Sequence, residues 1–250
     1  MLNEKQQLFC TSFMKTYGMN ARMAGGLYLL GTVFGIISAV VGGEVLSSTI
    51  SGQPLKGVDI LSVVFANASQ LTLGAFFVFM MGISLAAMTI FPYPIFRKDS
   101  EELATGMLLF RGALEGTGYF IITLCVLSLV SLGNEYVAAG ANSADLQPVG
   151  NVLYQFQDFI GPVGTIVFLI GGTCLYLSFF RTRRIPRWLS VWGLIGVAPY
   201  MAYALLHFFH MDNGIGLYLQ IPLAIQEIVM GLWLVIAGFN KEAVNQLDGA

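Results

Sequence analysis

The sequence predicts an all-α fold, a polytopic membrane helix bundle of about six transmembrane helices with both termini in the cytoplasm. Of the 250 residues, 56% are hydrophobic and only 10% are charged. Soluble domains carry roughly 45–50% apolar and about 25% charged residues. Six apolar runs are long enough for a bilayer, which takes about 20 residues. This composition excludes a water-soluble globular enzyme, a disordered chain and a nucleic-acid-binding protein.

The six predicted spans are separated by short polar connectors. They lie at about residues 22–45, 60–91, 105–132, 152–180, 187–210 and 217–239. The first run is too long for a signal-peptide core and lacks a cleavage pattern, so we expect it to be a span. We expect residues 134–150 to form an outer loop without a core of its own.

The chain divides into a leader at 1–20, one transmembrane domain at 21–240 and a cytoplasmic tail at 241–250. In the leader, apolar Leu8, Phe9 and Phe13 are interleaved with Lys5 and Lys15. This pattern fits either an amphipathic helix on the inner membrane surface or a frayed polar leader.

Basic residues predict the orientation. They gather before the first span, in the second and fourth connectors and in the tail: Lys5, Lys15, Arg22, Arg97, Lys98, Arg181, Arg183, Arg184, Arg187 and Lys241. The remaining connectors hold only Lys56. Because basic residues collect on the side that is not translocated, we expect alternate connectors and both termini to face the cytoplasm.

Small residues recur at every fourth position in the first span, at Gly31, Gly35, Ala39 and Gly43. Such spacing lets helix backbones approach closely in lipid. It fits packing within the bundle or, alternatively, a homodimer face. The sequence predicts the lipid bilayer and a possible homodimer as partners, and no other macromolecule. With 12 basic and 14 acidic residues, it offers no basic surface for nucleic acid.

Polar residues at membrane depth are the candidate site. They are Arg111, Glu115, Asp158, Gln226 and Glu227. At 1.5 Å per residue, Glu115 on the third span and Glu227 on the sixth both lie about 15 Å into the bilayer. Arg111 lies one turn from Glu115, and we expect it to pair with Glu227 in preference to Glu115, because Arg before Glu is the poorer i,i+4 orientation.

One arginine faces three acids in this band, which leaves two formal negative charges. Ionisable groups are costly in the hydrocarbon core and mark functional sites. We therefore expect a protonated acid, a bound cation or a water-filled cavity. The alternative is an Arg–carboxylate clamp that only fixes helix packing.

A metal site is a weaker hypothesis. His207, His210 and Asp158 could supply three ligands near the outer end of the bundle. The chain has only two histidines and no HExxH or GxGxxG motif. We therefore predict no cofactor, and an intramembrane enzyme is the least favoured function.

Several short motifs occur together in this chain. They are Arg22-x-Ala24-Gly25-Gly26-Leu27-Tyr28-Leu29, Arg111-x-x-x-Glu115, Gln157-Asp158-x-x-Gly161, Ile185-Pro186-Arg187-Trp188-Leu189 and Glu227-x-x-x-Gly231-x-Trp233. Over about residues 20–240 their order and spacing resemble domain-of-unknown-function family 4386, uncharacterised bacterial multi-pass membrane proteins. Where that family has a His before the fourth-span Asp, this chain has Gln157, which weakens a proton-relay role for the pair.

The resemblance implies the membrane fold and the positions of the site residues but no reaction. We expect a transporter-like protein that binds or transports a small solute, lipid or proton at the Arg/Glu/Asp band. The alternative is a structural or regulatory membrane subunit.

Overall fold

The computed structural model describes residues 4–51, 55, 59–140, 145–211 and 216–240. These residues form helices and their connectors, without a strand among them. The helices are α1 (Glu4–Val41), α2 (Gly43–Ser51), α3 (Ile60–Ala66), α4 (Ala68–Ile90), α5 (Tyr93–Phe96), α6 (Glu101–Gly106), the π-helical η1 (Met107–Leu114), α7 (Glu115–Ala138), α8 (Leu146–Thr182), α9 (Arg187–Phe208) and α10 (Gly216–Ile236).

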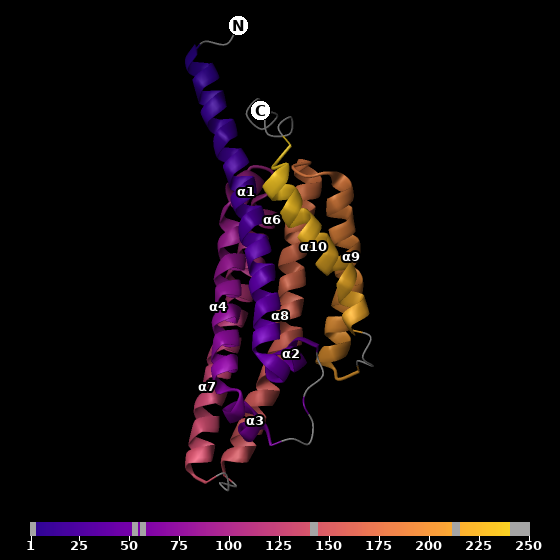
Figure 1. The fold of residues 1–250 in the computed structure, drawn as a ribbon. Coiled ribbons are helices and arrows are strands. Elements are labelled where there is room, and N and C mark those ends of the chain that lie inside the picture. Colours follow the sequence, from indigo (N-terminus) through magenta and orange to yellow (C-terminus); the bar gives the residue numbers. More distant parts are fainter. Residues whose placement is uncertain (1–3, 52–54, 56–58, 141–144, 212–215, 241–250) are drawn as a thin grey trace.

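Six helical stretches are long and apolar enough to cross a membrane, which confirms the predicted all-α, six-span fold. They are Tyr17–Val41, Ala68–Phe96, Glu101–Ala138, Leu146–Thr182, Arg187–Phe208 and Tyr218–Ile236. In the packing, α1 contacts α4, α4 contacts α7, α7 contacts α8, α8 contacts α9, α9 contacts α10, and α10 returns to α1. The spans therefore form a closed ring (Figure 1).

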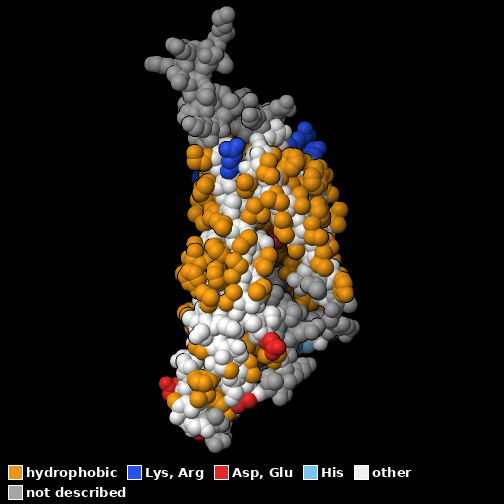
Figure 2. Space-filling model, in the orientation of Figure 1, with side chains coloured by type: hydrophobic (Ala, Val, Ile, Leu, Met, Phe, Trp, Pro, Cys, Tyr) orange, Lys and Arg blue, Asp and Glu red, His pale blue; other side chains and the backbone are white. Residues whose placement is uncertain are grey.

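The start of α1 and the end of α10 lie at one end of the ring, which we call the proximal end; the opposite end is the distal end (Figure 1). On the face drawn in Figure 2, Lys and Arg side chains gather at the proximal end and Asp and Glu side chains at the distal end. This separation agrees with the basic-residue pattern of the sequence. The cytoplasmic placement of the termini stays a prediction.

The second predicted span is shorter than expected. The apolar run from residue 60 is broken at Asn67, whose side-chain Nδ2 donates to the carbonyl of Val63 at 2.9 Å and whose φ of −114° leaves the helical region. Helix α3 therefore ends before α4 begins at Ala68. Asp59 caps α3 by accepting a hydrogen bond from the amide of Ser62.

The prediction of an outer loop without a core at 134–150 is wrong for residues 134–138 and 146–150, while residues 141–144 lie outside the described residues. Helix α7 continues to Ala138 and α8 begins at Leu146. Figure 1 shows the two helices extending together past α1, α9 and α10, with α3 beside them. Tyr136 of α7 and Tyr154 of α8 belong to a distal hydrophobic cluster with Leu61 of α3. Tyr136, which is buried in this cluster, and Leu146, which packs against it, lie beyond the predicted spans, and their contacts stabilise the longer helices.

A second hydrophobic cluster lies toward the proximal end, with Tyr28, Phe96 and Tyr176 among its fully buried members. Helix α1 is continuous from Glu4 to Val41, so no break in the helix marks the predicted leader boundary at residue 20. The division into leader, transmembrane domain and tail stays a prediction, and the tail 241–250 lies outside the described residues. Tyr28 of this hydrophobic cluster contacts Arg111 of the candidate site.

Candidate functional site

A buried ion cluster joins three of the six spanning stretches. Arg111 of η1 donates from Nη1 to both carboxylate oxygens of Glu115, at 2.7 and 2.8 Å. Its Nη2 donates to Oε1 of Glu227 on α10 at 3.2 Å and to the hydroxyl of Tyr28 on α1 at 3.0 Å. Arg111 and Glu115 are each 3% exposed, and Glu227 is 19% exposed. The two glutamates, which the sequence predicts at the same depth, both contact the guanidinium of Arg111.

Aromatic residues complete the cluster. The Tyr28 hydroxyl donates to Oε1 of Glu227, and the Tyr119 hydroxyl donates to Oε1 of Glu115 at 3.1 Å. The guanidinium carbon of Arg111 lies 4.3 Å from the ring centroid of Phe168 and 5.2 Å from that of Tyr28. Such contacts stabilise a cation away from water. Each carboxylate thus has an arginine and a tyrosine as partners.

The expectation that Arg111 prefers Glu227 is wrong, because its shortest contacts are to Glu115. The i,i+4 argument assumed a regular α-helix, but Arg111 lies in the π-helical η1. A π-helical turn holds an extra residue, which changes the directions of the side chains and is common at functional sites.

Glycine sets the distance between η1 and α8. A Cβ added at Gly171 would lie 2.4 Å from the amide nitrogen of Arg111. On the other side, a Cβ at Gly112 would lie 2.7 Å from Oγ1 of Thr89 on α4. These close backbone approaches hold the π-helical segment between two spans, as small residues do in membrane bundles.

A cavity of about 550 Å³ opens beside the cluster. Each of the six spanning stretches contributes to its wall, which includes Arg111, Glu115 and Glu227. Helix α1 runs away from the proximal end and α10 runs back to it, so the rest of their lining, such as Gly35 and Gln220, lies distal to the cluster. The ion cluster therefore forms the proximal end of the cavity.

Three glycines in the wall face open space. No heavy atom lies within 4 Å of a Cβ built at Gly118, Gly161 or Gly164. Glycines at helix contacts, such as Gly171, would clash if they carried a side chain. Gly118, Gly161 and Gly164 therefore do not serve helix contact, and their missing side chains enlarge the cavity.

The cavity reaches the outer surface of the bundle. Ile36 and Val40 of α1 line it and are also exposed, Val40 by 76%. Proximally, a Cβ at Gly25 of α1 would lie 2.7 Å from the carbonyl oxygen of Gly231 on α10, so the two helices are in close contact there. Toward the distal end α10 inclines away from α1 (Figure 1). Figure 2 shows acidic atoms recessed among hydrophobic side chains on this face.

The other predicted site residues lie elsewhere. Gln226 is buried toward α9, where its Nε2 donates to the carbonyl of Leu189 at 3.0 Å. The side chain of Asp158 lies outside the described part of the structure. The structure therefore joins Arg111, Glu115 and Glu227 but does not bring Gln226 to them.

The two histidines lie toward the distal end of the bundle. His207 lines the cavity, with its ring 5.6 Å from that of Tyr203. The ring of His210 lies 5.6 Å from that of Phe159. Among the residues that the structure describes, no three metal-ligating side chains are grouped. The proposed third ligand, Asp158, is outside that set.

Sequence reasoning missed Tyr28, Tyr119 and Phe168. The depth arithmetic could have found Tyr28, because Tyr28 and Arg111 each lie six residues after the expected starts of their spans at 22 and 105. Tyr119 is one turn from Glu115 on the same helix. For Phe168, no feature of the sequence distinguishes it from the other phenylalanines.

The comparisons with known proteins agree with the sequence motifs. Residues 23–238 match the family described as domain of unknown function, DUF4386. No curated protein and no solved structure matches the chain. The match spans the whole ring of helices and the site, so this chain is a multi-pass integral membrane protein that belongs to domain-of-unknown-function family 4386.

Proposed function

We propose that this protein binds a small amphipathic molecule in the cavity between its six spans, with the polar head of the ligand at Arg111, Glu115 and Glu227. The observation that carries the proposal is the buried ion cluster at one end of a cavity of about 550 Å³. Ligand sites are concave, mostly apolar and contain a few convergent polar groups. The opening beside Ile36 and Val40 gives a lipid-like molecule a route from the bilayer.

The charge of the cluster favours a cationic or hydrogen-donating head. One guanidinium meets two carboxylates. Arg111 is directed to both glutamates, while Glu227 is partly exposed and borders the cavity. A primary amine or a proton at Glu227 would balance the remaining charge, since unpaired charges are costly away from water.

A purely structural role explains the ion cluster but not the open space beside it. An ion cluster that only fixes helix packing needs no adjacent space, yet Gly118, Gly161 and Gly164 leave the wall open. We also propose the bacterial cytoplasmic membrane as the location, on the basis of the resemblance of the sequence motifs to a bacterial family, with the cytoplasmic side assigned from the basic-residue pattern.

Filling the cavity tests the proposal. Gly164→Leu would project into the open space, and Gly26→Leu is the matched control, because Gly26 has open space around its Cβ but does not line the cavity. Dansylcadaverine, an aromatic body with a primary amine, serves as the fluorescent probe. We expect Gly164→Leu to weaken its binding at least about tenfold, as a loss of roughly 1.4 kcal/mol would. Gly26→Leu should bind like the wild type.

The head of the probe tests the charge argument. A dansyl amide without charge and a dansyl aminohexanoate with a carboxylate carry the same aromatic body. We expect the amine to bind best and the carboxylate worst, and Glu227→Gln should reduce the advantage of the amine. Equal binding to the wild type and to Gly164→Leu would refute the cavity as the site. A preference for the carboxylate would refute the assigned head charge.

A further inference from the structure

A second cavity, of about 450 Å³, lies at the proximal end between the α8–α9 connector and the end of α10. Its wall holds the arginines Arg183, Arg184 and Arg187, together with Trp233 and residues 237–240. Among the described residues that line it, none is acidic. The cavity is therefore bordered by three positive charges and is separate from the site between the spans.

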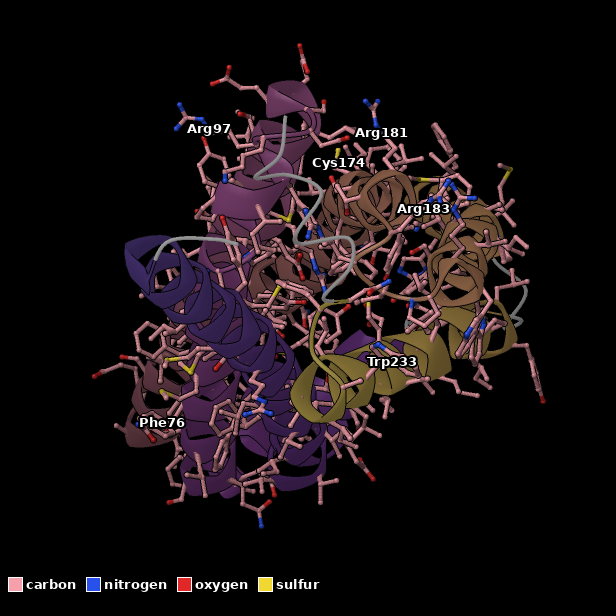
Figure 3. The ribbon with its side chains drawn as sticks, turned by 90° about the horizontal axis from the view of Figure 1, so that it is seen from above. Phe76, Arg97, Cys174, Arg181, Arg183 and Trp233 are labelled. Carbon is pink, nitrogen blue, oxygen red and sulfur yellow. The ribbon has the colours of Figure 1, made fainter. Side chains whose placement is uncertain are left out.

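Among the described residues, no carboxylate is paired with Arg183 or Arg187. Arg181, only two residues before Arg183, is paired with Asp99, from its Nε to Oδ2 at 3.0 Å. Seen from the proximal end, Arg97 and Arg181 lie toward the edge away from α10, and Arg183 lies nearer to α9 (Figure 3). Two described acids of this end are therefore paired with other basic residues, Asp99 with Arg181 and Glu101 with Arg97.

The backbone adds to the positive potential. Helix α8 ends at Thr182 and is capped by Arg183, which has a left-handed φ of 52°. The 22-residue α9 begins at Arg187 after Pro186, which gives no side-chain cap. The start of a helix carries a partial positive charge and free amide groups. The amide of Asn240 donates to the carbonyl of Arg184 at 2.8 Å and ties the end of α10 to this connector. The wall is thereby built from two segments far apart in sequence.

Trp233 in the cavity wall favours a position of this cavity at the membrane surface. The guanidinium carbon of Arg187 lies 5.1 Å from the ring centroid of Phe180. Trp233 lies on α10 and contributes to the wall. Tryptophan is enriched at the level of lipid headgroups. A group held between these arginines is therefore at headgroup depth.

We propose that this cavity binds a phosphate group, carried by an anionic phospholipid headgroup or by a soluble phosphate. Guanidinium groups suit phosphate because they donate paired hydrogen bonds. Basic pockets between transmembrane helices on the cytoplasmic side are typical sites of anionic headgroups. The positive-inside rule alone requires charges in the connector but no cavity around them.

Charge-matched variants of the full chain test this proposal. Arg183→Gln with Arg187→Gln removes two charges from the cavity and leaves the buried Arg184 in place. The control, Arg97→Gln with Arg181→Gln, removes two charges from the same end but outside the cavity wall. Binding in neutral detergent at about 150 mM salt is followed by tryptophan fluorescence, and Trp233→Phe identifies the signal. The probes are dioctanoyl phosphatidylglycerol, dioctanoyl phosphatidylcholine and inorganic phosphate.

We expect phosphatidylglycerol to bind more tightly than phosphatidylcholine. The Arg183/Arg187 variant should lose roughly 30-fold in affinity, since each basic residue near a lipid surface contributes about fivefold. The Arg97/Arg181 variant should stay within about twofold. Saturable binding of inorganic phosphate with the same dependence supports the phosphate site with a soluble source. No saturable binding of any probe, or equal weakening by both variants, overturns the proposal.

Discussion

Removal of the Arg111 guanidinium should be among the most destabilising single changes in this protein. Arg111 makes four hydrogen bonds, two to Glu115 and one each to Glu227 and Tyr28. Arg111→Gln would leave two carboxylates without their counter-charge in a site where Arg111 and Glu115 are 3% exposed. Breaking a buried pair in this way costs about 3–5 kcal/mol. We expect a loss of that size in the free energy of unfolding.

A second substitution, added to Arg111→Gln, shows whether Glu115 or Glu227 depends more on the charge of Arg111. Glu115 has the shorter contacts, at 2.7 and 2.8 Å against 3.2 Å for Glu227, and is less exposed. Glu227 also borders the cavity and keeps the hydrogen bond from Tyr28. Glu115→Gln added to Arg111→Gln should therefore restore about 2 kcal/mol or more, and Glu227→Gln about 1 kcal/mol or less.

Equilibrium unfolding in mild detergent at neutral pH, followed by circular dichroism, measures these differences for the wild type, the three single variants and the two double variants. Equal rescue by the two glutamine substitutions would refute the assignment of Glu115 as the main partner. An Arg111→Gln variant as stable as the wild type would refute the buried cluster itself.

Three further predictions concern the helix contact, the distal cap and the orientation. Gly171→Ala should lower the free energy of unfolding by about 1–3 kcal/mol through overpacking, because its Cβ would lie 2.4 Å from the Arg111 amide. Gly164→Ala, whose Cβ would meet open space, should change it by no more than about 1 kcal/mol. Equal losses in the two variants would contradict the close contact at Gly171. Burial disfavours the ionised Asp59, but hydrogen bonds from Gln147 and Ser62 outweigh it and lower its pKa from 3.8 to about 2. The stability from ionised Asp59 is therefore present above about pH 4 and lost as the pH falls toward about 2; unfolding midpoints across that window should fall in the wild type, and an equal fall in Asp59→Asn would rule out Asp59 as the cause. Reporter fusions should place residue 250 in the cytoplasm and residue 140 outside, and an external signal from residue 250 would overturn this orientation.

The sequence by itself determined the membrane class, the number of spans and the depth at which Arg111, Glu115 and Glu227 lie. Composition and run length are local properties, and a bilayer of fixed thickness converts position along a span into depth. The helical extensions at residues 134–138 and 146–150 were not predictable from hydropathy, because tertiary contacts such as those of Tyr136 and Leu146 stabilise them.

The tertiary structure decided which side chains face one another. Gln226 and Glu227 are neighbours with the same depth, yet one donates to α9 and the other binds Arg111. At 3.6 residues per turn, adjacent side chains point about 100° apart, and only packing sets the rotation of a helix. The π-helical turn around Arg111 and the cavity beside Gly118, Gly161 and Gly164 also depend on the neighbouring helices. A glycine in the sequence can either allow close helix contact or leave open space, and only the packing decides which.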